Sequence, residues 1–427
     1  MTRRNDFMKE LDELLKSERD DHNPLTQIKI GKLYQSHMVD GETDESSWEN
    51  ALAWFSKAME QNCPEGFYFV ASCYDIDADE SRKNPELSFS LYSKAFELGV
   101  VQAGVEIGRC YANGYGTEKD EKKALEYYLK AAGRGIPSSF RLVAECFLFG
   151  KGTERNPLEA KKWYEKLVKH DYSSYGIFPT GDDYLFLGIA CKLSAENKAS
   201  FKKAFEYFQK SAAEGNPNGI NEVGECYFYG IGVKEDNNKA FEMFKKSADK
   251  DCAFAYKNLG HCYSKGFGVK ENKGKAFSCF KKSFDMGNEQ ASLELAICYN
   301  QGEGVEEDLD IAFAYFSRAK KLGLPESWWW LGKCYEYGDG CKQDFKKAFS
   351  YYKKSMELGD PKGYVAVGEC YIAGLGTKKD FSKGWGIIQS QAKSGNEIAQ
   401  DWLVENYDGD APRKEPLNCV GLDEREA

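Results

Sequence analysis

The stretch that decides the fold is VGECYFYGIGVKEDNNKAFEMFKKSADK, residues 223–250. Its pattern returns as LGHCYSKGFGVKENKGKAFSCFKKSFDM at residues 259–286. The small residue at the second position of each copy recurs at a constant step of 36, at Gly224, Gly260, Ala296, Gly332 and Gly368. A fixed period of this length indicates stacked supersecondary units that share a continuous core. Because looser copies extend the array upstream, we predict about ten repeats between residues 24 and 407.

Each copy carries the signals of two helices joined by a glycine loop. A proline opens the first helix in several copies, where a missing N–H costs nothing because first-turn donors are unpaired. A G-x-G loop supplies the left-handed backbone that reverses the chain, and a capping residue precedes an amphipathic second helix. The predicted opening prolines are Pro24, Pro64, Pro137, Pro217, Pro325 and Pro361. The predicted N-caps are Ser47, Asn84, Asp120, Asn156, Ser200, Asp236, Asn272, Asp308, Asp344 and Asp380.

The combined pattern, A-x-x-x-L-G-x-x-Y, G-x-G-V/T and D-x-x-K-A-x-x-Y/W, resembles the Sel-1-like repeat, a relative of the tetratricopeptide repeat. The resemblance covers nearly the whole chain. It implies an all-α solenoid, a right-handed superhelix of antiparallel helix pairs, whose members act as adaptors that hold other proteins. The copy LGIACKLSAENKASFKKAF, residues 187–205, lacks both the tyrosine after its glycine and the G-x-G loop, so we expect a different turn there.

The ends of the array predict the domain organisation. Residues 1–23 place Phe7, Leu11 and Leu14 on one helical face, as an N-terminal capping helix requires. The repeat solenoid is expected over residues 24–407, with an irregular insertion near 173–180. The polar residues 408–427 are expected to form a flexible C-terminal tail.

Composition excludes several classes of protein. The net charge of -10 and pI near 5.3 oppose non-specific attraction to nucleic acid or to anionic membranes. No apolar run approaches the roughly 20 residues of a membrane span, and the first residues lack the apolar core of a signal peptide. We therefore expect neither nucleic-acid binding nor membrane insertion.

A column of cysteines two residues after the small residue is expected to pack as small buried hydrophobes. Cys63 and Cys252 lie ten positions before the nearest column cysteine, which on one helix is about 15 Å and beyond the ~7 Å limit of a disulfide. The thiols are therefore expected to be reduced, which predicts a cytoplasmic protein. The column cysteines are Cys73, Cys110, Cys146, Cys226, Cys262, Cys298, Cys334 and Cys370.

Signals for chemistry are weak, and we expect neither a cofactor nor a metal. Cys334 and Cys341 could hold zinc, but they form no C-x-x-C pair and have no histidine nearby. Some secreted relatives are linked to β-lactam binding or hydrolysis, and S-x-x-K occurs here at Ser278/Lys281 and in three other second helices. Because the supporting S-D-N and K-T-G elements are missing, we predict a protein that is not an enzyme.

Three consecutive tryptophans, at positions 328–330, test the helical register. Trp328 shares the stripe of Leu331 and Tyr335 and is expected to pack between the two helices of its repeat. Trp330 is expected to contact an adjacent repeat. Trp329 is rotated by about 100° from Trp328, onto the face that by resemblance lines the concave surface.

The concave face is the predicted partner-binding site. Its residues vary in charge and size between copies while the core columns repeat, so this face is free to encode one partner. The candidate binding residues are Arg109, Arg141, Glu145, Phe149, Asn221, Glu225, Phe228, Tyr229, Lys257, His261, Trp329, Lys333 and Tyr337. The alternative is a solvated inner wall with occasional exposed aromatics. The insertion, within HDYSSYGIFPTGDDY (170–184), is either a second contact site or a tolerated surface loop.

The sequence thus predicts a non-catalytic scaffold that binds a peptide or helix of a partner protein along the concave groove. Two alternatives remain open at this point. One is a hydrolase of the β-lactam or peptidoglycan type, and the other is an RNA-binding helical array, which the acidic composition opposes.

Overall fold

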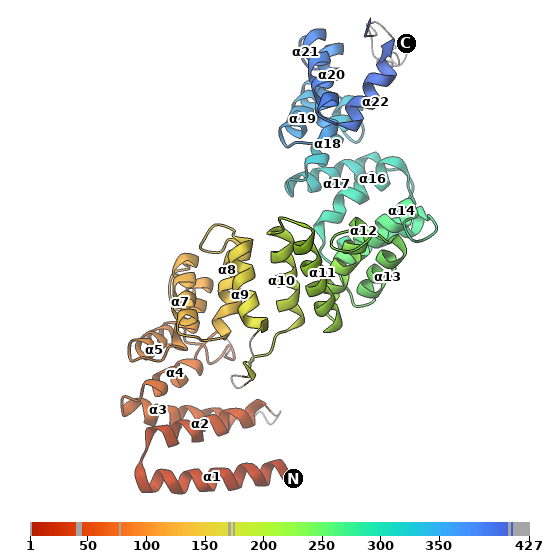
Figure 1. Cartoon of the computed structure of the whole chain (residues 1–427). Coiled ribbons are helices and arrows are strands. Elements are labelled where there is room, and N and C mark those ends of the chain that lie inside the picture. The colour runs from red at the N-terminus through yellow and green to blue at the C-terminus, as the bar shows by residue number, and fades with distance from the viewer. Residues whose placement is uncertain are drawn as a thin grey trace. The chain divides into compact units, whose positions relative to one another are not determined.

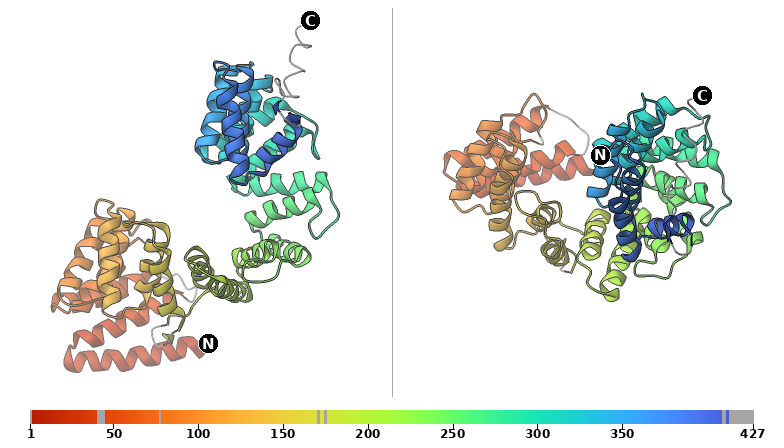
Figure 2. Two further views of the ribbon diagram at one scale, coloured as in Figure 1. Left: turned by 45° about the horizontal axis from the view of Figure 1, so that its top comes forward. Right: turned by 90° about the horizontal axis from the view of Figure 1, so that it is seen from above.

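The computed structural model describes residues 2–39, 45–76, 78–169, 172–173, 176–408 and 411–412. The chain divides into two compact units, residues 1–219 and 220–427. Within each unit, the helices follow one another as antiparallel pairs (Figure 1), and further views show the same succession (Figure 2).

The helices of the first unit are α1 (Thr2–Asp21), α2 (Pro24–Val39), α3 (Glu45–Glu60), α4 (Pro64–Ser72), α5 (Pro85–Glu97), α6 (Ala103–Asn113), α7 (Glu121–Gly133), α8 (Ser138–Phe149), α9 (Pro157–Lys169), α10 (Gly181–Leu193) and α11 (Lys198–Ala213). The helices that follow are α12 (Pro217–Tyr229), α13 (Asn237–Ala248), α14 (Ala253–Lys265), α15 (Lys273–Asp285), the short 3-10 helix η2 (Glu289–Ala291), α16 (Ser292–Gln301), α17 (Leu309–Lys321), α18 (Pro325–Tyr337), α19 (Phe345–Glu357), α20 (Pro361–Ala373), α21 (Phe381–Lys393) and α22 (Glu397–Asn406).

The predicted all-α fold is confirmed. Over the described ranges, helix pairs run from α2/α3 to α20/α21 without interruption by a sheet. The strands found there are β1 (Tyr407–Asp408) and β2 (Ala411–Pro412), which pair antiparallel after the last helix.

Capping side chains set the starts of the second helices, with two corrections to the prediction. Asp120 is typical of the eight confirmed caps, since its carboxylate accepts the backbone N–H of Lys123. Ser47 does not cap, because it lies inside α3. In the irregular repeat the cap is Asn197, whose side chain accepts from the N–H of Ser200, so Ser200 belongs to the first turn of α11. The other confirmed caps are Asn84, Asn156, Asp236, Asn272, Asp308, Asp344 and Asp380.

The repeating small residue is explained by a ring from the second helix. A β-carbon added at Gly260 would lie 2.3 Å from Cε1 of Phe280, which is itself buried. The second loop glycine has a different neighbour: a β-carbon at Gly268, whose φ is +67°, would lie 2.1 Å from the carbonyl oxygen of Asn237 in the preceding repeat. The first glycine therefore lets the helices of one pair approach, and the second lets successive pairs stack.

The cysteine column packs in the core, as predicted. Cys226 and Cys262 are fully buried, and burial raises the pKa of the Cys262 thiol to about 12. The cysteines within the described part of the chain form no disulfide bonds with one another. Their place beside rings such as Phe244 is that of small apolar side chains.

The two ends of the repeat array were predicted to be a capping helix and a tail. At the N-terminal end α1 packs on α2, with Leu11 buried and the ring of Phe7 edge-on to Tyr34 at 5.9 Å. These contacts suit a capping helix, and the boundaries at residues 23 and 407 stay a prediction. Of the predicted tail, Asp408, Ala411 and Pro412 are described, and the remainder lies outside the described residues.

Among the helices described, we find none with the length and apolar character of a membrane span.

Candidate interaction surface on the first helices

All of the predicted partner-binding residues lie on first helices. Arg109 belongs to α6, and Arg141, Glu145 and Phe149 belong to α8, all in the first unit. The residues in the second unit come from three first helices: Asn221, Glu225, Phe228 and Tyr229 from α12, Lys257 and His261 from α14, and Trp329, Lys333 and Tyr337 from α18. We call the surface that these residues mark in each unit the first-helix wall.

Part of the wall consists of hydrogen bonds between neighbouring first helices. Asn258 of α14 donates to Glu225 Oε1 of α12 at 3.3 Å, and His261 Nε2 of α14 lies 3.1 Å from Glu294 Oε1 of α16. The same relation returns where Trp402 Nε1 of α22 donates to Glu369 of α20 at 2.8 Å. Each contact joins the residue after the small column to a residue 33 positions later. Glu225 and His261 therefore couple adjacent repeats, whatever else they bind.

Asn221 and Lys257, two further predicted binding residues, also form hydrogen bonds to a neighbouring repeat. Asn221 is 4 % exposed, and its side-chain oxygen accepts from Asn258 at 2.9 Å while its amide donates to Glu225 at 3.2 Å. Lys257 Nζ donates to Gln290 at 3.3 Å across the next repeat. Asn258, Glu294 and Gln290 are not among the residues predicted from the sequence; their signal is a fixed offset of 33 positions from a polar candidate.

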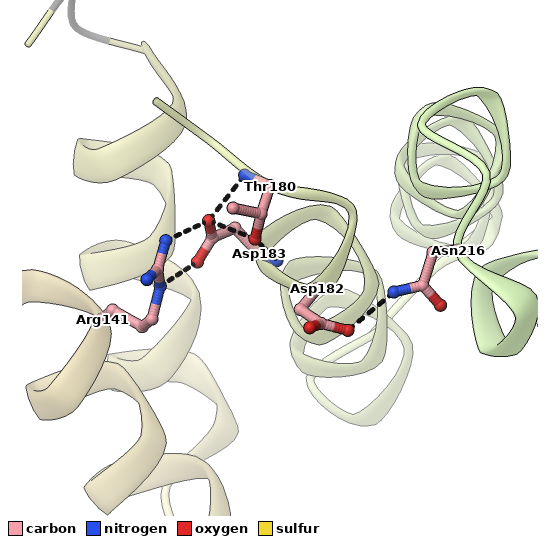
Figure 3. A network of polar contacts seen from close by, with 5 residues as sticks. All are labelled: Arg141, Thr180, Asp182, Asp183 and Asn216. Carbon is pink, nitrogen blue, oxygen red and sulfur yellow. Dashed lines mark hydrogen bonds and ion pairs between the residues drawn. The ribbon is translucent and has the colours of Figure 1, made fainter. Parts of the chain in front are cut away.

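In the first unit, Arg141 is held by a buried carboxylate at the end of the insertion (Figure 3). Its Nε and Nη2 donate to the two oxygens of Asp183 at 2.6 and 2.7 Å, and Asp183 is fully buried. Asp183 also closes a capping box with Thr180 at the start of α10. The hydrogen bonds to Asp183 raise the pKa of Arg141, whereas burial raises the pKa of the neighbouring Glu145 carboxyl. Arg141 thus anchors the insertion to α8.

The insertion itself is partly packed into the first unit. Tyr172 and Ile177 form an isolated antiparallel bridge and lie against the core around Phe140. Phe178 is 63 % exposed. Residues 170, 171, 174 and 175 lie outside the described residues, so the second contact site proposed for this loop stays a prediction.

Exposed aromatic side chains occupy one column of the wall. Phe149, Tyr229 and Tyr337 are the last residues of α8, α12 and α18, each directly before the first loop glycine. They are 45 %, 66 % and 42 % exposed. The ring column of the second helices, by contrast, is almost fully buried, with Phe244 and Phe316 at 2 % or less. Aromatic surface is therefore kept in water at the wall while equivalent rings elsewhere are covered.

The three tryptophans have different surroundings. Trp328 meets Tyr351 of its own second helix at 5.5 Å, and Trp330 stacks on Phe316 of the preceding repeat at 5.1 Å, so both packing predictions are confirmed. Trp329 is half-buried against the core around Tyr352. The ammonium groups of Lys362 and Lys333 lie 4.8 and 5.5 Å from its ring centre. The binding role of Trp329 stays a prediction, and truncating its side chain would also disturb the packing around Tyr352.

The wall of the second unit contains a pocket of about 340 Å³, which we call the α12–α14 pocket. Four of the predicted residues, Glu225, Phe228, Tyr229 and His261, line it. The remaining lining residues are Phe244, Asn258, Lys265 and Phe267.

A pocket in the first unit, of about 440 Å³, includes Arg109. Its polar groups contact one another: Arg109 forms an ion pair with Glu106 at 3.1 Å, and the Tyr92 hydroxyl donates to Asp75 at 2.7 Å. Arg82 adds an ion pair to Asp79 and lies over the ring of Trp48. This pocket is therefore lined mainly by polar and charged groups, unlike the aromatic α12–α14 pocket.

The side chains considered above for metal binding and catalysis have contacts of their own. In the described ranges, no cluster of three or more His, Cys, Asp or Glu side chains could hold a metal ion. Cys341, one of the candidate zinc ligands, directs its Sγ to the Cys334 carbonyl oxygen at 3.4 Å. Ser278 of the S-x-x-K pair with Lys281 donates to the Gly274 carbonyl of its own helix at 2.9 Å.

The stacked helix pairs and their variable wall define a tetratricopeptide-like repeat protein. The Sel1 repeat matches most of the chain, so this protein belongs to the Sel1 repeat family. The matched segments are residues 49–63, 65–100, 104–136, 141–172, 197–216, 217–252, 253–288, 290–324, 325–360 and 361–386. The gap at 173–196 contains the insertion and the first helix of the irregular repeat, whose turn at Ser194 has no left-handed glycine.

This chain is similar to several solved structures. A protective antigen of uropathogenic Escherichia coli, described as having an SLR fold, is 21% identical, with a TM-score of 0.55 over 92% of this chain and 90% of that chain. A Sel1 repeat protein from Oxalobacter formigenes is 20% identical, with a TM-score of 0.40 over 83% and 89%. Yeast Tom70 is 11% identical, with a TM-score of 0.35 over 95% of both chains. A search of curated protein sequences found no match.

Proposed function

We propose that this protein is a non-catalytic interaction scaffold that holds a peptide or helix of a partner protein along the first-helix wall. Sel1 and related helical repeats commonly serve as protein-interaction scaffolds. The observation that carries the proposal is the exposed aromatic column, Phe149, Tyr229 and Tyr337, at the ends of three first helices. Large aromatic side chains are the residue type that most often dominates interface energetics.

Hydrogen bonds elsewhere on the wall also support this function. Glu225, Asn258 and His261 hold one another or the next helix through hydrogen bonds. Side chains that are ordered before binding lose less conformational entropy when a partner arrives. We therefore assign these residues the positioning of the contact surface, and the exposed rings its binding energy.

We also propose that the scaffold works in a reducing compartment such as the cytoplasm. The column cysteines are buried and form no disulfide bonds with one another, and burial raises the pKa of Cys298 and Cys334 to about 12. Because the thiolate is the reactive form, such thiols serve packing and not disulfide exchange. This arrangement suits a compartment in which cysteines stay reduced.

Site-specific photo-crosslinking in native lysate tests the proposed surface. A benzophenone amino acid would replace Tyr229 or Tyr337 on the wall, and Lys246 on the exposed face of second helix α13 as the matched control. We expect discrete crosslinked partners from positions 229 and 337 and none of these from position 246. Equal crosslinking from all three positions would remove the assignment of the first-helix wall.

A further inference from the structure

The α12–α14 pocket has walls built from aromatic rings of three segments. Phe228 of α12 lies edge-on to Tyr229 at 4.9 Å and to Phe267, in the loop after α14, at 5.3 Å. Phe244 of α13 also lines the pocket and is 2 % exposed. Tyr229 and Phe267 remain 66 % and 37 % exposed. Edge-to-face contacts with a further ring would cover this surface and are favourable beyond the area they bury.

The charged groups of the pocket differ in whether they have partners. Glu225 accepts from the Asn258 and Asn221 side chains, and His261 contacts Glu294. Lys265, the last residue of α14, is exposed and has no ion-pair partner among the described residues. Its ammonium group stands on a flexible four-carbon stem and can follow a ligand at the mouth of the pocket. Lys265 therefore supplies a positive charge to the pocket lining, whereas the negative charge of Glu225 is held by the amides of Asn221 and Asn258.

The size of the pocket limits the occupant. A volume of about 340 Å³ lies at the lower end of the roughly 300–1,000 Å³ that small-ligand sites span. It accommodates one large side chain and not a whole helix. An aromatic side chain matches the walls, and a neighbouring carboxylate matches Lys265.

We propose that the α12–α14 pocket is an anchor site for an aromatic side chain of a partner peptide, and that Lys265 binds the carboxylate of an adjacent aspartate or glutamate. This inference rests on the proposed scaffold function and specifies its ligand. The pocket takes an aromatic–acidic pair in an extended segment. Lys265 selects the acidic neighbour, and the rings around Phe228 supply the burial.

Fluorescence anisotropy with short labelled peptides tests the pair directly on the full chain. The probes are Gly-Ser-Gly-Ser-Phe-Glu-Gly-Ser-Gly and the same peptide with Lys in place of Glu. We expect the Phe-Glu peptide to bind more tightly than the Phe-Lys peptide. The variant Lys265→Glu should weaken Phe-Glu binding by about tenfold and strengthen Phe-Lys binding, whereas Lys246→Glu, the same charge change on the outer face of α13, should alter neither.

Several results would overturn the inference. The first is the absence of Phe-Glu binding up to about 1 mM, which corresponds to a binding free energy near −4 kcal/mol. The second is an equal loss of affinity for both peptides in Lys265→Glu. The third is displacement of the Phe-Glu peptide by a uridine oligonucleotide. The last result would mean that the rings stack nucleobases. Because Lys265→Glu is expected to gain one ligand as it loses the other, misfolding cannot imitate the predicted outcome. If position 229 still crosslinks to a partner while the peptide fails to bind, the scaffold function stands and only the anchor pocket falls.

Discussion

Two glycines of α21 test the packing of the last helix pair. Gly384→Ala and Gly386→Ala place the same methyl group two residues apart on one helix. A β-carbon at Gly384 would lie 2.4 Å from the carbonyl oxygen of Gly368 and 2.7 Å from Cγ1 of Ile372. At Gly386 it would meet nothing within 4 Å. Because a backbone oxygen cannot swing away as a side-chain tip can, Gly384→Ala must push α20 and α21 apart.

The expected magnitudes have opposite signs. Alanine is a better helix former than glycine by about 1 kcal/mol at either position. Overpacking a core costs about 1–3 kcal/mol. Gly386→Ala should therefore raise the free energy of unfolding by up to about 1 kcal/mol, and Gly384→Ala should lower it by up to about 2 kcal/mol. The difference between the two variants, about 1–3 kcal/mol, does not depend on the propensity value.

Hydrogen exchange of the α20 and α21 amides is the suitable assay, supported by urea unfolding followed by circular dichroism. Repeat proteins can open locally, so a global midpoint could hide a change at one end of the array. Exchange should become faster in Gly384→Ala and slower in Gly386→Ala. Equal protection in the two variants would show that α20 and α21 do not approach through Gly368 and Gly384.

Three further outcomes follow from buried polar and thiol groups. Asp183→Asn should lower the free energy of unfolding by about 1–3 kcal/mol, because it weakens the bidentate contact with Arg141. The control is Asp182→Asn, whose contact with Asn216 is exposed (Figure 3) and which should change the free energy of unfolding by less than about 1 kcal/mol. Equal thermal shifts in the two variants would contradict this expectation. Burial raises the pKa of Glu369 above its ordinary 4.5, so its stabilising contribution is present below that pH and is lost as the pH rises through the raised pKa. Glu369→Gln, which keeps an acceptor for Trp402, should therefore be more stable than the wild type at pH 7 and nearly equal to it at pH 4; a larger gain at pH 4 in thermal melts would reverse the sign. Native labelling with iodoacetamide should modify the half-buried Cys279 and Cys341 before Cys262, whose pKa is raised to about 12; mass spectrometry showing Cys262 modified first would refute the packing of the column.

The wrong prediction of Ser200 as the N-cap of α11 has a local cause. Ser200 falls at the predicted cap position because the irregular repeat lacks the G-x-G loop that sets the register in other copies. Asn197, three residues earlier, offers its carbonyl oxygen to the N–H of Ser200 and begins the helix one turn sooner. Both residue types are good caps, so the choice between them depends on where the preceding helix ends.

The wall shows what variation between repeats cannot distinguish. A polar residue that differs from copy to copy could face a partner or pair with the next helix. His261 contacts Glu294, and Arg141 is held by Asp183 across the insertion. Their variability is thus explained in part by matched neighbours within the chain. Exposed rings such as Tyr229, which is 66 % exposed although Phe228 contacts one edge of it, are better indicators of a contact surface.

By itself, the sequence determined the helix pairs, their period and the side that each pair buries, because capping, glycine torsions and helical periodicity act over a few residues. Only the tertiary structure decided which side chains of the wall meet across neighbouring repeats and where the α12–α14 pocket opens. Those contacts join atoms about one repeat apart in the chain, and their distances depend on how closely one helix pair stacks on the next. A glycine such as Gly268 permits that approach, but only the tertiary structure shows that its neighbour is the carbonyl oxygen of Asn237.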